Sequence, residues 1–286
     1  MPYVSARDMV RAASAQHYAV AQFNLNNLES IRTFLALAQE THSPLILGVS
    51  MGLARKMGGY RTIADTVRNM MDYDGVTVPV ALHADHSSFD AACEALRCGF
   101  SSVMFDGSRL PIEENLRLTR ELAALCHDQG ASLEVEAGAV EGGEDGGEAA
   151  GELASPEHCR LLAKSGADML AAGIGSMHGA YPPNWKGLNW DLLREIRQET
   201  GDFPLVLHGG SGIPAEDIRR AIGMGISKIN VNSECREAFD RATRAYCKGA
   251  PEDPAHMQLI TLQPGLEAVK DVALSKMQHF GCLGKA

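Results

Sequence analysis

The sequence predicts a single (β/α)₈ barrel followed by one extra helix near its carboxyl end. Eight short apolar or β-branched runs alternate with helical patterns along the chain, which is typical of βα units around a parallel sheet. The length of 286 residues suits such a barrel, which uses roughly 250 residues as one unit. Neither a repeat nor a linker interrupts the alternation, so we expect one domain over residues 1–286.

Each expected strand is followed by an amphipathic segment. The strands are expected at residues 19–23, 44–49, 78–83, 102–105, 132–136, 168–173, 204–208 and 228–231. The helices are expected at residues 28–41, 60–73, 89–98, 112–127, 156–165, 189–199, 214–224 and 234–247, with the extra helix at 265–280. Ser155 and Pro156 illustrate the helix starts, because serine caps a helix and proline fits its first turn. In a closed barrel the loops at the carboxyl ends of the strands form the functional face.

Composition excludes several classes of partner. The formal net charge of -10 argues against nucleic acid and anionic membranes, which require clustered Lys and Arg. Seven scattered cysteines without CxxC spacing indicate reduced thiols rather than a disulfide framework. Apolar runs all fall short of the ~18 residues of a membrane span. We therefore expect a cytoplasmic protein that binds neither nucleic acid nor membranes.

Three histidines fall where the barrel would aim them at one mouth. His86 follows the third expected strand, His178 follows the sixth, and His208 ends the seventh. Any one of them alone is more readily explained as a hydrogen-bonded structural residue. Three imidazoles converging from separate strands, however, suit a catalytic zinc ion, which keeps one coordination position open.

Asp85 immediately precedes His86 in the sequence. A carboxylate beside a metal ligand can exchange a proton with a substrate oxygen. The same residue could instead orient a ligand or cap the next helix, and spacing alone leaves these roles open. His83 is expected to point to the other side of the strand, as a core residue or a partner of the ligands rather than as a ligand itself. Lys228 begins its expected strand, at the wrong end of the barrel for a Schiff-base lysine.

Two glycine- and amide-rich loops follow the last two expected strands. They contain Gly209, Gly210 and Ser211 in the first loop and Asn230, Val231, Asn232 and Ser233 in the second. Loops in these places commonly hold phosphate through backbone N–H groups, and the serines can add hydroxyl donors. Turn and capping chemistry alone is the other interpretation.

Acidic residues around the fifth expected strand have several possible roles. Residues 138–151 are rich in Gly and Glu, and a loop of this length on the functional face predicts a lid. Spacing does not single out Glu144 among its carboxylates. Glu134 and Glu136 are expected to face opposite ways, with one supporting the metal site. Asp106 could orient a histidine or cap the next helix.

Six segments in this order resemble the class II fructose-bisphosphate and tagatose-bisphosphate aldolases. They are AQFNLNNLE at 21–29, LHADH at 82–86, LEVE at 133–136, GSMHG at 175–179, LVLHGGSGIP at 205–214 and KINVNSE at 228–234. The resemblance covers nearly the whole chain. It implies a zinc-dependent lyase that reversibly splits a ketose 1-phosphate or 1,6-bisphosphate into dihydroxyacetone phosphate and an aldehyde. That aldehyde would be glyceraldehyde 3-phosphate or another one.

The resemblance also implies roles for individual residues. His86, His178 and His208 would bind zinc, Asp85 would handle the hydroxyl proton, and Glu144 would match the lid glutamate that moves protons at carbon. Dihydroxyacetone phosphate, sometimes with Na⁺ or K⁺ nearby, would be held by Gly179, Gly209, Gly210, Ser211, Asn230, Val231, Asn232 and Ser233. Asn24 and Ser50 would be further substrate contacts. From their places at the fourth and fifth expected strands, rather than from the resemblance, we expect Asp106 and Glu136 to support the metal ligands. The family further implies a homodimer or homotetramer.

The chain departs from the family pattern at a few positions. Ser87 stands where Gly, Cys or His is usual, Ala137 replaces a larger aliphatic residue, and Glu141 replaces a glycine. Asn232 stands where fructose-type members carry Asp, and we find no fructose-type arginine for a second phosphate. Two other functions are open: a zinc metallohydrolase acting on a phosphorylated substrate, and a non-catalytic phosphosugar-binding subunit.

Overall fold

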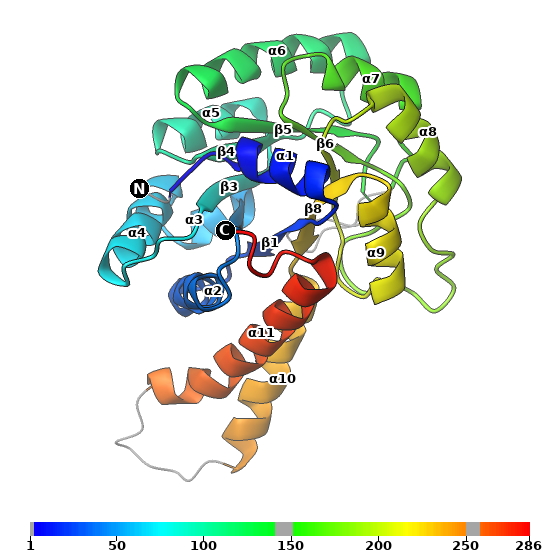
Figure 1. Cartoon of the computed structure of the whole chain (residues 1–286). Helices are drawn as coiled ribbons and strands as arrows, with labels where there is room; N and C mark the ends of the chain where they lie inside the picture. The colour runs from blue at the N-terminus through cyan, green and yellow to red at the C-terminus, as the bar shows by residue number, and fades with distance from the viewer. Residues whose placement is uncertain (1–2, 141–150, 250–257) are drawn as a thin grey trace.

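The strands form the closed parallel barrel that the sequence predicts. A computed structural model describes residues 3–140, 151–249 and 258–286. Its strands are β1 Val20–Asn24, β2 Leu45–Ser50, β3 Val80–Ser87, β4 Ser102–Phe105, β5 Ser132–Ala137, β6 Met169–Ala172, β7 Leu205–Leu207 and β8 Ile226–Val231. Neighbours pair in sequence order, and β8 closes on β1 through Val20 and Lys228 (Figure 1). The predicted (β/α)₈ fold is therefore confirmed.

The expected helices surround the barrel. They are α2 Leu28–Glu40, α4 Tyr60–Tyr73, α5 Phe89–Arg97, α6 Ile112–Asp128, α7 Pro156–Ala163, α8 Trp190–Thr200, α9 Ala215–Gly223 and α10 Ser233–Gly249. The predicted start of α7 is confirmed, because the Ser155 side chain accepts from the His158 N–H and Pro156 occupies the first turn. Apolar side chains of the helices and strands form the buried core between them.

Two helices were not predicted. α1, Ala6–Gln16, lies across one end of the barrel in Figure 1. Its Ala6 N–H donates to Ser132 Oγ at the start of β5, at 3.1 Å, so it covers the end at which the strands begin. α3, Met51–Lys56, is a short helix capped by Ser50 at the end of β2. α1 precedes the first βα unit, and α3 is a short extra helix within the connection from β2 to α4, so the repeat pattern did not reveal them.

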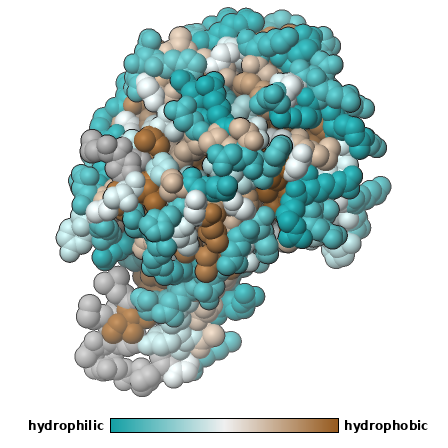
Figure 2. Space-filling model, viewed as in Figure 1, coloured by the Kyte–Doolittle hydropathy of each residue, from teal (hydrophilic) through white to brown (hydrophobic). Residues whose placement is uncertain are grey.

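The extra helix, α11, spans Gln258–Phe280 and begins earlier than expected. It packs along α10, and Figure 1 shows the pair projecting from the barrel. Lys270 of α11 contacts Glu40 of α2 at 2.7 Å, tying the helix to the barrel. Figure 2 shows a mostly hydrophilic surface with separate apolar patches, in keeping with the charge composition. Among the described residues, no helix is long and apolar enough to cross a membrane.

Candidate active site

The structure brings His86, His178 and His208 together at the carboxyl ends of the strands. His86 lies near the end of β3, and the other two follow β6 and β7. Their ring centroids are 5.0 Å (His86 to His178), 4.6 Å (His86 to His208) and 5.9 Å (His178 to His208) apart. One nitrogen from each ring lies within 4.8 Å of the other two. The three side chains can therefore coordinate one common ion.

A backbone irregularity places Asp85 and His86 at the same site. Adjacent residues of a regular strand point to opposite faces. His86, however, has a φ of 45°, in the left-handed region, and the pairing register of β3 with β4 shifts between Ala84 and Ser87. Such a bulge re-aims a side chain next to a functional site. Asp85 consequently stays inside the barrel while His86 turns toward His208.

Hydrogen bonds orient the two closest imidazoles. Nδ1 of His86 lies 3.3 Å from Oδ2 of Asp106, and Nε2 of His208 lies 2.7 Å from Oε1 of Glu134. Because carboxylates accept, each of these nitrogens is the protonated one in a neutral ring. The remaining nitrogens, Nε2 of His86 and Nδ1 of His208, face each other at 2.9 Å.

Two facing lone pairs repel unless a proton or a cation lies between them. Burial lowers the pKa of His208, although its hydrogen bond to Glu134 acts in the opposite direction, so the ring is held in the neutral form that binds metal. With His178 beside them, the three rings supply the nitrogen donors of an open catalytic zinc site. The donor set therefore fits the zinc ion expected from the sequence.

Asp85 is fully buried and is held by amide donors. Its Oδ2 accepts from Gln22 Nε2 at 2.8 Å and from Asn24 Nδ2 at 3.0 Å. Its Oδ1 lies 3.4 Å from Nδ2 of Asn230. Asn24 and Asn230, both expected from the resemblance to contact substrate, thus contact the candidate base. Ser50, which was also expected to contact substrate, lies opposite Asp85 in the pairing of β2 with β3.

The charge state of Asp85 follows from its surroundings. Burial by itself raises the pKa of Asp85, but His86, His208 and Lys228 outweigh burial and hold the pKa below its ordinary value. The group is therefore a carboxylate at neutral pH. An ionised, oriented carboxylate beside three imidazoles can accept a proton from a bound substrate.

Two expectations about inward-facing residues were wrong. Glu134 and Glu136 were expected to face opposite ways, yet both are buried and both reach histidines, His208 and His86 respectively. Residues two apart on a strand share a face, so both point into the barrel. His83 was expected on the other side of the strand, but it lies inside the barrel with Nε2 3.9 Å from Oδ1 of Asp85.

The sequence placed Lys228 at an end of the barrel, but the structure shows it fully buried within the barrel. β8 begins earlier, at Ile226. The ammonium lies 2.8 Å from Oε2 of Glu134 and donates to Oδ1 of Asn230 at 2.8 Å. Burial alone would raise the pKa of Glu134, but Lys228 and His208 lower it to about 2. Lys228 is thus the counter-ion of the carboxylate that orients His208, a candidate metal ligand.

Glu136 and Asp106 both lie beside His86. The carboxylate of Glu136 is 3.8 Å from Nδ1 of His86 and accepts the Val140 N–H at 3.4 Å. Burial raises the pKa of Glu136 to about 8. Asp106 also accepts from the hydroxyl of Ser108 at 2.6 Å. Because α6 begins only at Ile112, the orienting role of Asp106 is favoured over helix capping.

The first glycine-rich loop is tightly held by the backbone around it. Gly209 has a φ of 68°, and a Cβ there would lie 2.2 Å from the Met177 carbonyl oxygen, so only glycine fits. The Tyr181 hydroxyl donates to the Gly209 carbonyl at 2.7 Å. The Gly210 N–H donates to the Asn230 carbonyl at 2.9 Å, which ties this loop to the end of β8.

The other candidate phosphate residues surround this loop. Ser211 is buried and accepts the Glu234 N–H at 3.3 Å. Val231 is the buried last residue of β8, and Ser233 begins α10. Gly179, with a φ of 90°, follows His178 in the loop after β6, in open space. Glu144 lies outside the described residues.

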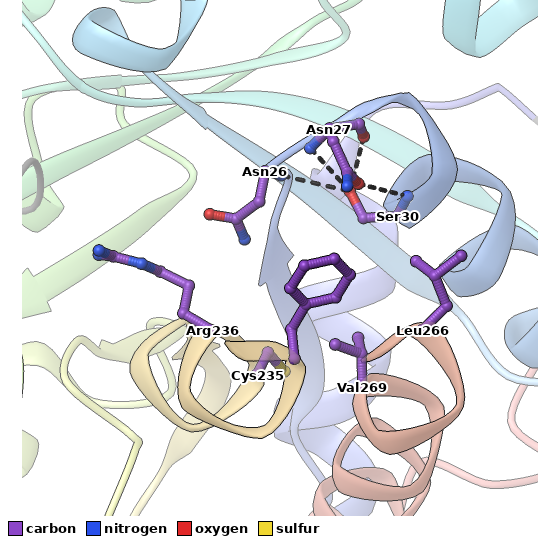
Figure 3. Close-up of a pocket in the computed structure, with 8 residues that line it drawn as sticks. Asn26, Asn27, Ser30, Cys235, Arg236, Leu266 and Val269 are labelled. Atoms are coloured by element: carbon purple, nitrogen blue, oxygen red, sulfur yellow. Dashed lines mark hydrogen bonds between the residues drawn. The ribbon is translucent and has the colours of Figure 1, made fainter. Parts of the chain in front are cut away.

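A cavity of about 250 Å³ lies beside this region, between the β1–α2 loop, α10 and α11 (Figure 3). Asn26, which donates to Oδ1 of Asn232 at 3.5 Å, lies on one side together with Arg236. Leu266 and Val269 line the α11 side. Arg236 was not predicted from the sequence, although it falls three residues after Ser233, in the first turn of a helix that begins at the carboxyl end of the barrel.

Gln22 and Tyr181 were also missed. Gln22 lies two residues before Asn24 on β1, so strand alternation places both on one face, and this signal could have identified it. Tyr181 lies in the irregular segment after β6, where no sequence pattern indicates contact with Gly209.

Comparisons with known proteins agree with this geometry. The family model described as class-II fructose-bisphosphate aldolase matches residues 4–285. The chain therefore belongs to the class II fructose-bisphosphate aldolase family, and it is a carbon–carbon lyase. This membership favours the aldolase over the metallohydrolase and over the non-catalytic subunit.

Individual relatives match over their full length. Fructose-bisphosphate aldolase of Streptococcus pneumoniae is 42% identical, with 100% of each chain covered. That of Mycoplasma pneumoniae is 44% identical, with 99% of each covered. The crystal structure of the YdjI aldolase from Escherichia coli superposes with a TM-score of 0.84 at 30% identity, covering 99% of both chains.

Proposed function

We propose that this protein catalyses reversible, zinc-dependent cleavage of a ketose 1-phosphate or 1,6-bisphosphate into dihydroxyacetone phosphate and an aldehyde. The observation that carries the proposal is the buried, ionised Asp85 beside three converging imidazoles. Family membership supplies the reaction class, and the names of its relatives favour fructose 1,6-bisphosphate with glyceraldehyde 3-phosphate as the aldehyde.

Asp85 performs the first proton transfer of this mechanism. Its carboxylate takes the proton from the C4 hydroxyl, and the C3–C4 bond breaks as that oxygen becomes an aldehyde carbonyl. The electron pair of the broken bond stays on the dihydroxyacetone phosphate half. Zinc held by His86, His178 and His208 would supply Lewis-acid stabilisation of the negative charge on that half. Glu144 then returns a proton to C3.

Amide and glutamate side chains keep these groups in place. Gln22, Asn24 and Asn230 fix the Asp85 carboxylate through its two oxygens. Glu134 fixes the His208 ring, and Lys228 balances the charge of Glu134. Loss of such an orienting partner typically costs about 10–100-fold in metal affinity or activity.

The phosphate of the dihydroxyacetone half is proposed to bind at the loops after β6, β7 and β8. Gly179 and Gly209 offer backbone without side chains, and Ser211 and Ser233 offer hydroxyl donors. Ser233 also begins α10, whose amino terminus carries partial positive charge. Asn232 is proposed to contact the substrate from the same edge, and a sodium or potassium ion is proposed to share the site.

Arg236 is the proposed partner of a second phosphate. Its side chain is exposed beside the cavity that also includes Asn26, next to Asn232. A guanidinium in this place can bind a phosphate at the far end of a ketose chain. Replacement of Arg236 by Met should raise KM for a ketose bisphosphate about tenfold or more, as loss of a charge-assisted contact does, and should leave a ketose 1-phosphate nearly unchanged.

A substrate screen tests the proposal directly. Purified zinc-loaded protein is incubated with ketose 1-phosphates and 1,6-bisphosphates of different stereochemistry, and dihydroxyacetone phosphate is detected with a coupled enzyme. Release from at least one ketose phosphate is expected. No release from any of them, with zinc bound, would contradict the proposal.

Assembly is proposed to be a homodimer or homotetramer, with the projecting α10 and α11 as a contact surface. Light scattering across working concentrations measures the mass. A monomer throughout would rule this assembly out.

A further inference from the structure

Glu234, in the first turn of α10, bridges three elements of the structure. Its Oε1 accepts the Gly212 N–H at 2.8 Å, and its own N–H donates to Ser211 Oγ at 3.3 Å. Its Oε2 lies 2.5 Å from Nζ of Lys276 on α11. The carboxylate thus joins the loop after β7, the start of α10 and the C-terminal helix.

These contacts leave Glu234 in an unfavourable place for an anion site. Gly212 directly follows Ser211, a residue of the proposed phosphate loop. A carboxylate bonded to that loop repels a phosphate dianion, because like charges a few ångströms apart disfavour each other. The structure compensates for this with Lys276, whose side chain is only 11% exposed and whose ammonium contacts the same carboxylate.

We propose that Glu234 and Lys276 are positioning residues for phosphate binding. Glu234 fixes the conformation of the loop by holding the Gly212 N–H, and Lys276 cancels the negative charge that Glu234 would otherwise present to the phosphate. Through this pair the position of α11 controls the affinity of the Ser211 loop for phosphate, although α11 is not part of that loop. The inference rests on the proposed function, in which the loop of Ser211 binds phosphate.

The alternative is that the pair is only structural. An acidic residue in the first turn stabilises any helix, and a lysine on α11 stabilises the packing of α11 on α10. A structural role predicts that either replacement weakens the site in the same direction. Electrostatic positioning predicts opposite directions, because one replacement removes a positive charge near the phosphate and the other removes a negative one.

The experiment measures the inhibition constant of inorganic phosphate, and KM and kcat for a ketose 1-phosphate, in zinc-loaded protein. Lys276→Met is expected to raise the inhibition constant and KM about tenfold at low salt with kcat little changed, and the effect should shrink at about 0.5 M salt. Glu234→Gln keeps an acceptor for the Gly212 N–H and is expected to lower the inhibition constant about twofold. The double variant Glu234→Gln with Lys276→Met should return to within about threefold of the parent.

Lys270→Met is the matched control, because Lys270 also ties α11 to the body of the protein through Glu40, away from the loop. It should leave phosphate inhibition within about twofold of the parent, as expected for an exposed ion pair. Lys276→Arg keeps the positive charge and should therefore keep the parental inhibition constant and KM. If Lys276→Met and Lys270→Met behave alike, or if Glu234→Gln weakens phosphate binding as much as Lys276→Met, the inference is wrong.

Failure of the proposed function looks different. In that case the parental protein would not be inhibited by phosphate, and Ser211→Ala would not change KM. If Lys276→Met fails to fold, Glu234→Gln decides alone, because a structural role predicts weaker phosphate binding and positioning predicts stronger binding.

Discussion

The two ends of the barrel use polar side chains in different ways. At the end covered by α1, Asp168 accepts from Arg7 Nε at 2.6 Å, from the Leu133 N–H at 2.9 Å and contacts His127 Nε2 at 3.1 Å. At the opposite end, His86 and His208 present lone pairs to each other at 2.9 Å. One buried carboxylate is satisfied by its neighbours, whereas the facing nitrogens need a proton or a cation between them.

This difference separates structural polar groups from functional ones. Buried polar groups in a stable protein are normally paired within the chain, because an unpaired group loses its hydration without compensation. The Asp168 cluster follows this rule, and its purpose is to hold α1 against the strands. The histidine cluster instead gathers three imidazoles around one point at the carboxyl end of the barrel, which makes this end the candidate reactive end.

The largest expected effect is removal of the metal. Dialysis against a chelator should abolish cleavage, and zinc should restore it, because the three imidazoles lose the charge that they were arranged to bind. Metal content by atomic emission and cleavage by coupled assay are measured on the same samples. Full activity in metal-free protein would show that the histidine cluster does not act through a metal ion, and the two ends of the barrel would then not differ in this way.

A smaller effect is expected from Glu134→Gln, which alters the partner of a metal ligand. Zinc affinity should fall about 10–100-fold, as for other orienting partners of metal-bound histidines. Unfolding should also become easier by about 3–5 kcal/mol, because Lys228 is left as a buried, unpaired charge. Competition with a zinc indicator and chemical denaturation measure the two effects.

The double variant Glu134→Gln with Lys228→Met separates these effects. It removes both buried charges, so stability should recover while zinc affinity stays low. If zinc affinity recovers together with stability, Glu134 acts only through folding and not through His208.

The smallest effect on catalysis is expected at the end of the barrel that α1 covers. Asp168→Asn should lower the free energy of unfolding by about 2 kcal/mol, because it weakens hydrogen bonds from a charged partner. The kcat/KM of the folded protein should stay within about twofold of the parent, a change of only about 0.4 kcal/mol. A large loss of kcat/KM with native-like stability would show that this end also contributes to the reaction.

The sequence predicted the barrel well, since each strand is a buried apolar run between turn residues. α1 was missed because it precedes the first βα unit, and α3 because it is an extra helix within the connection from β2 to α4. The shared position of Asp85 and His86 depends on a bulge with a φ of 45° at His86, which no alternation rule anticipates. The shared face of Glu134 and Glu136, by contrast, could have been predicted from the sequence, because residues two apart on a strand point the same way.

Partners across the barrel were harder to predict. Lys228 and Glu134 are separated by nearly a hundred residues, and their contact depends on how the barrel closes. The link from Lys276 through Glu234 to Gly212 likewise joins three distant segments. Candidate ligands could be found from their places after strands, but the residues that orient them required the three-dimensional structure.

In the proposed mechanism Asp85 transfers protons while His86 binds the metal, and a comparison of Asp85→Ala with His86→Ala distinguishes these two roles. Three quantities are measured in each variant: zinc content, ketose phosphate cleavage, and proton exchange at dihydroxyacetone phosphate. Asp85→Ala should retain zinc and much of the exchange but lose cleavage by about 10²-fold or more. His86→Ala should lose all three, because the ligand set is broken. If Asp85→Ala loses its zinc or cleaves at the parental rate, Asp85 is not the base and the proposed mechanism is wrong.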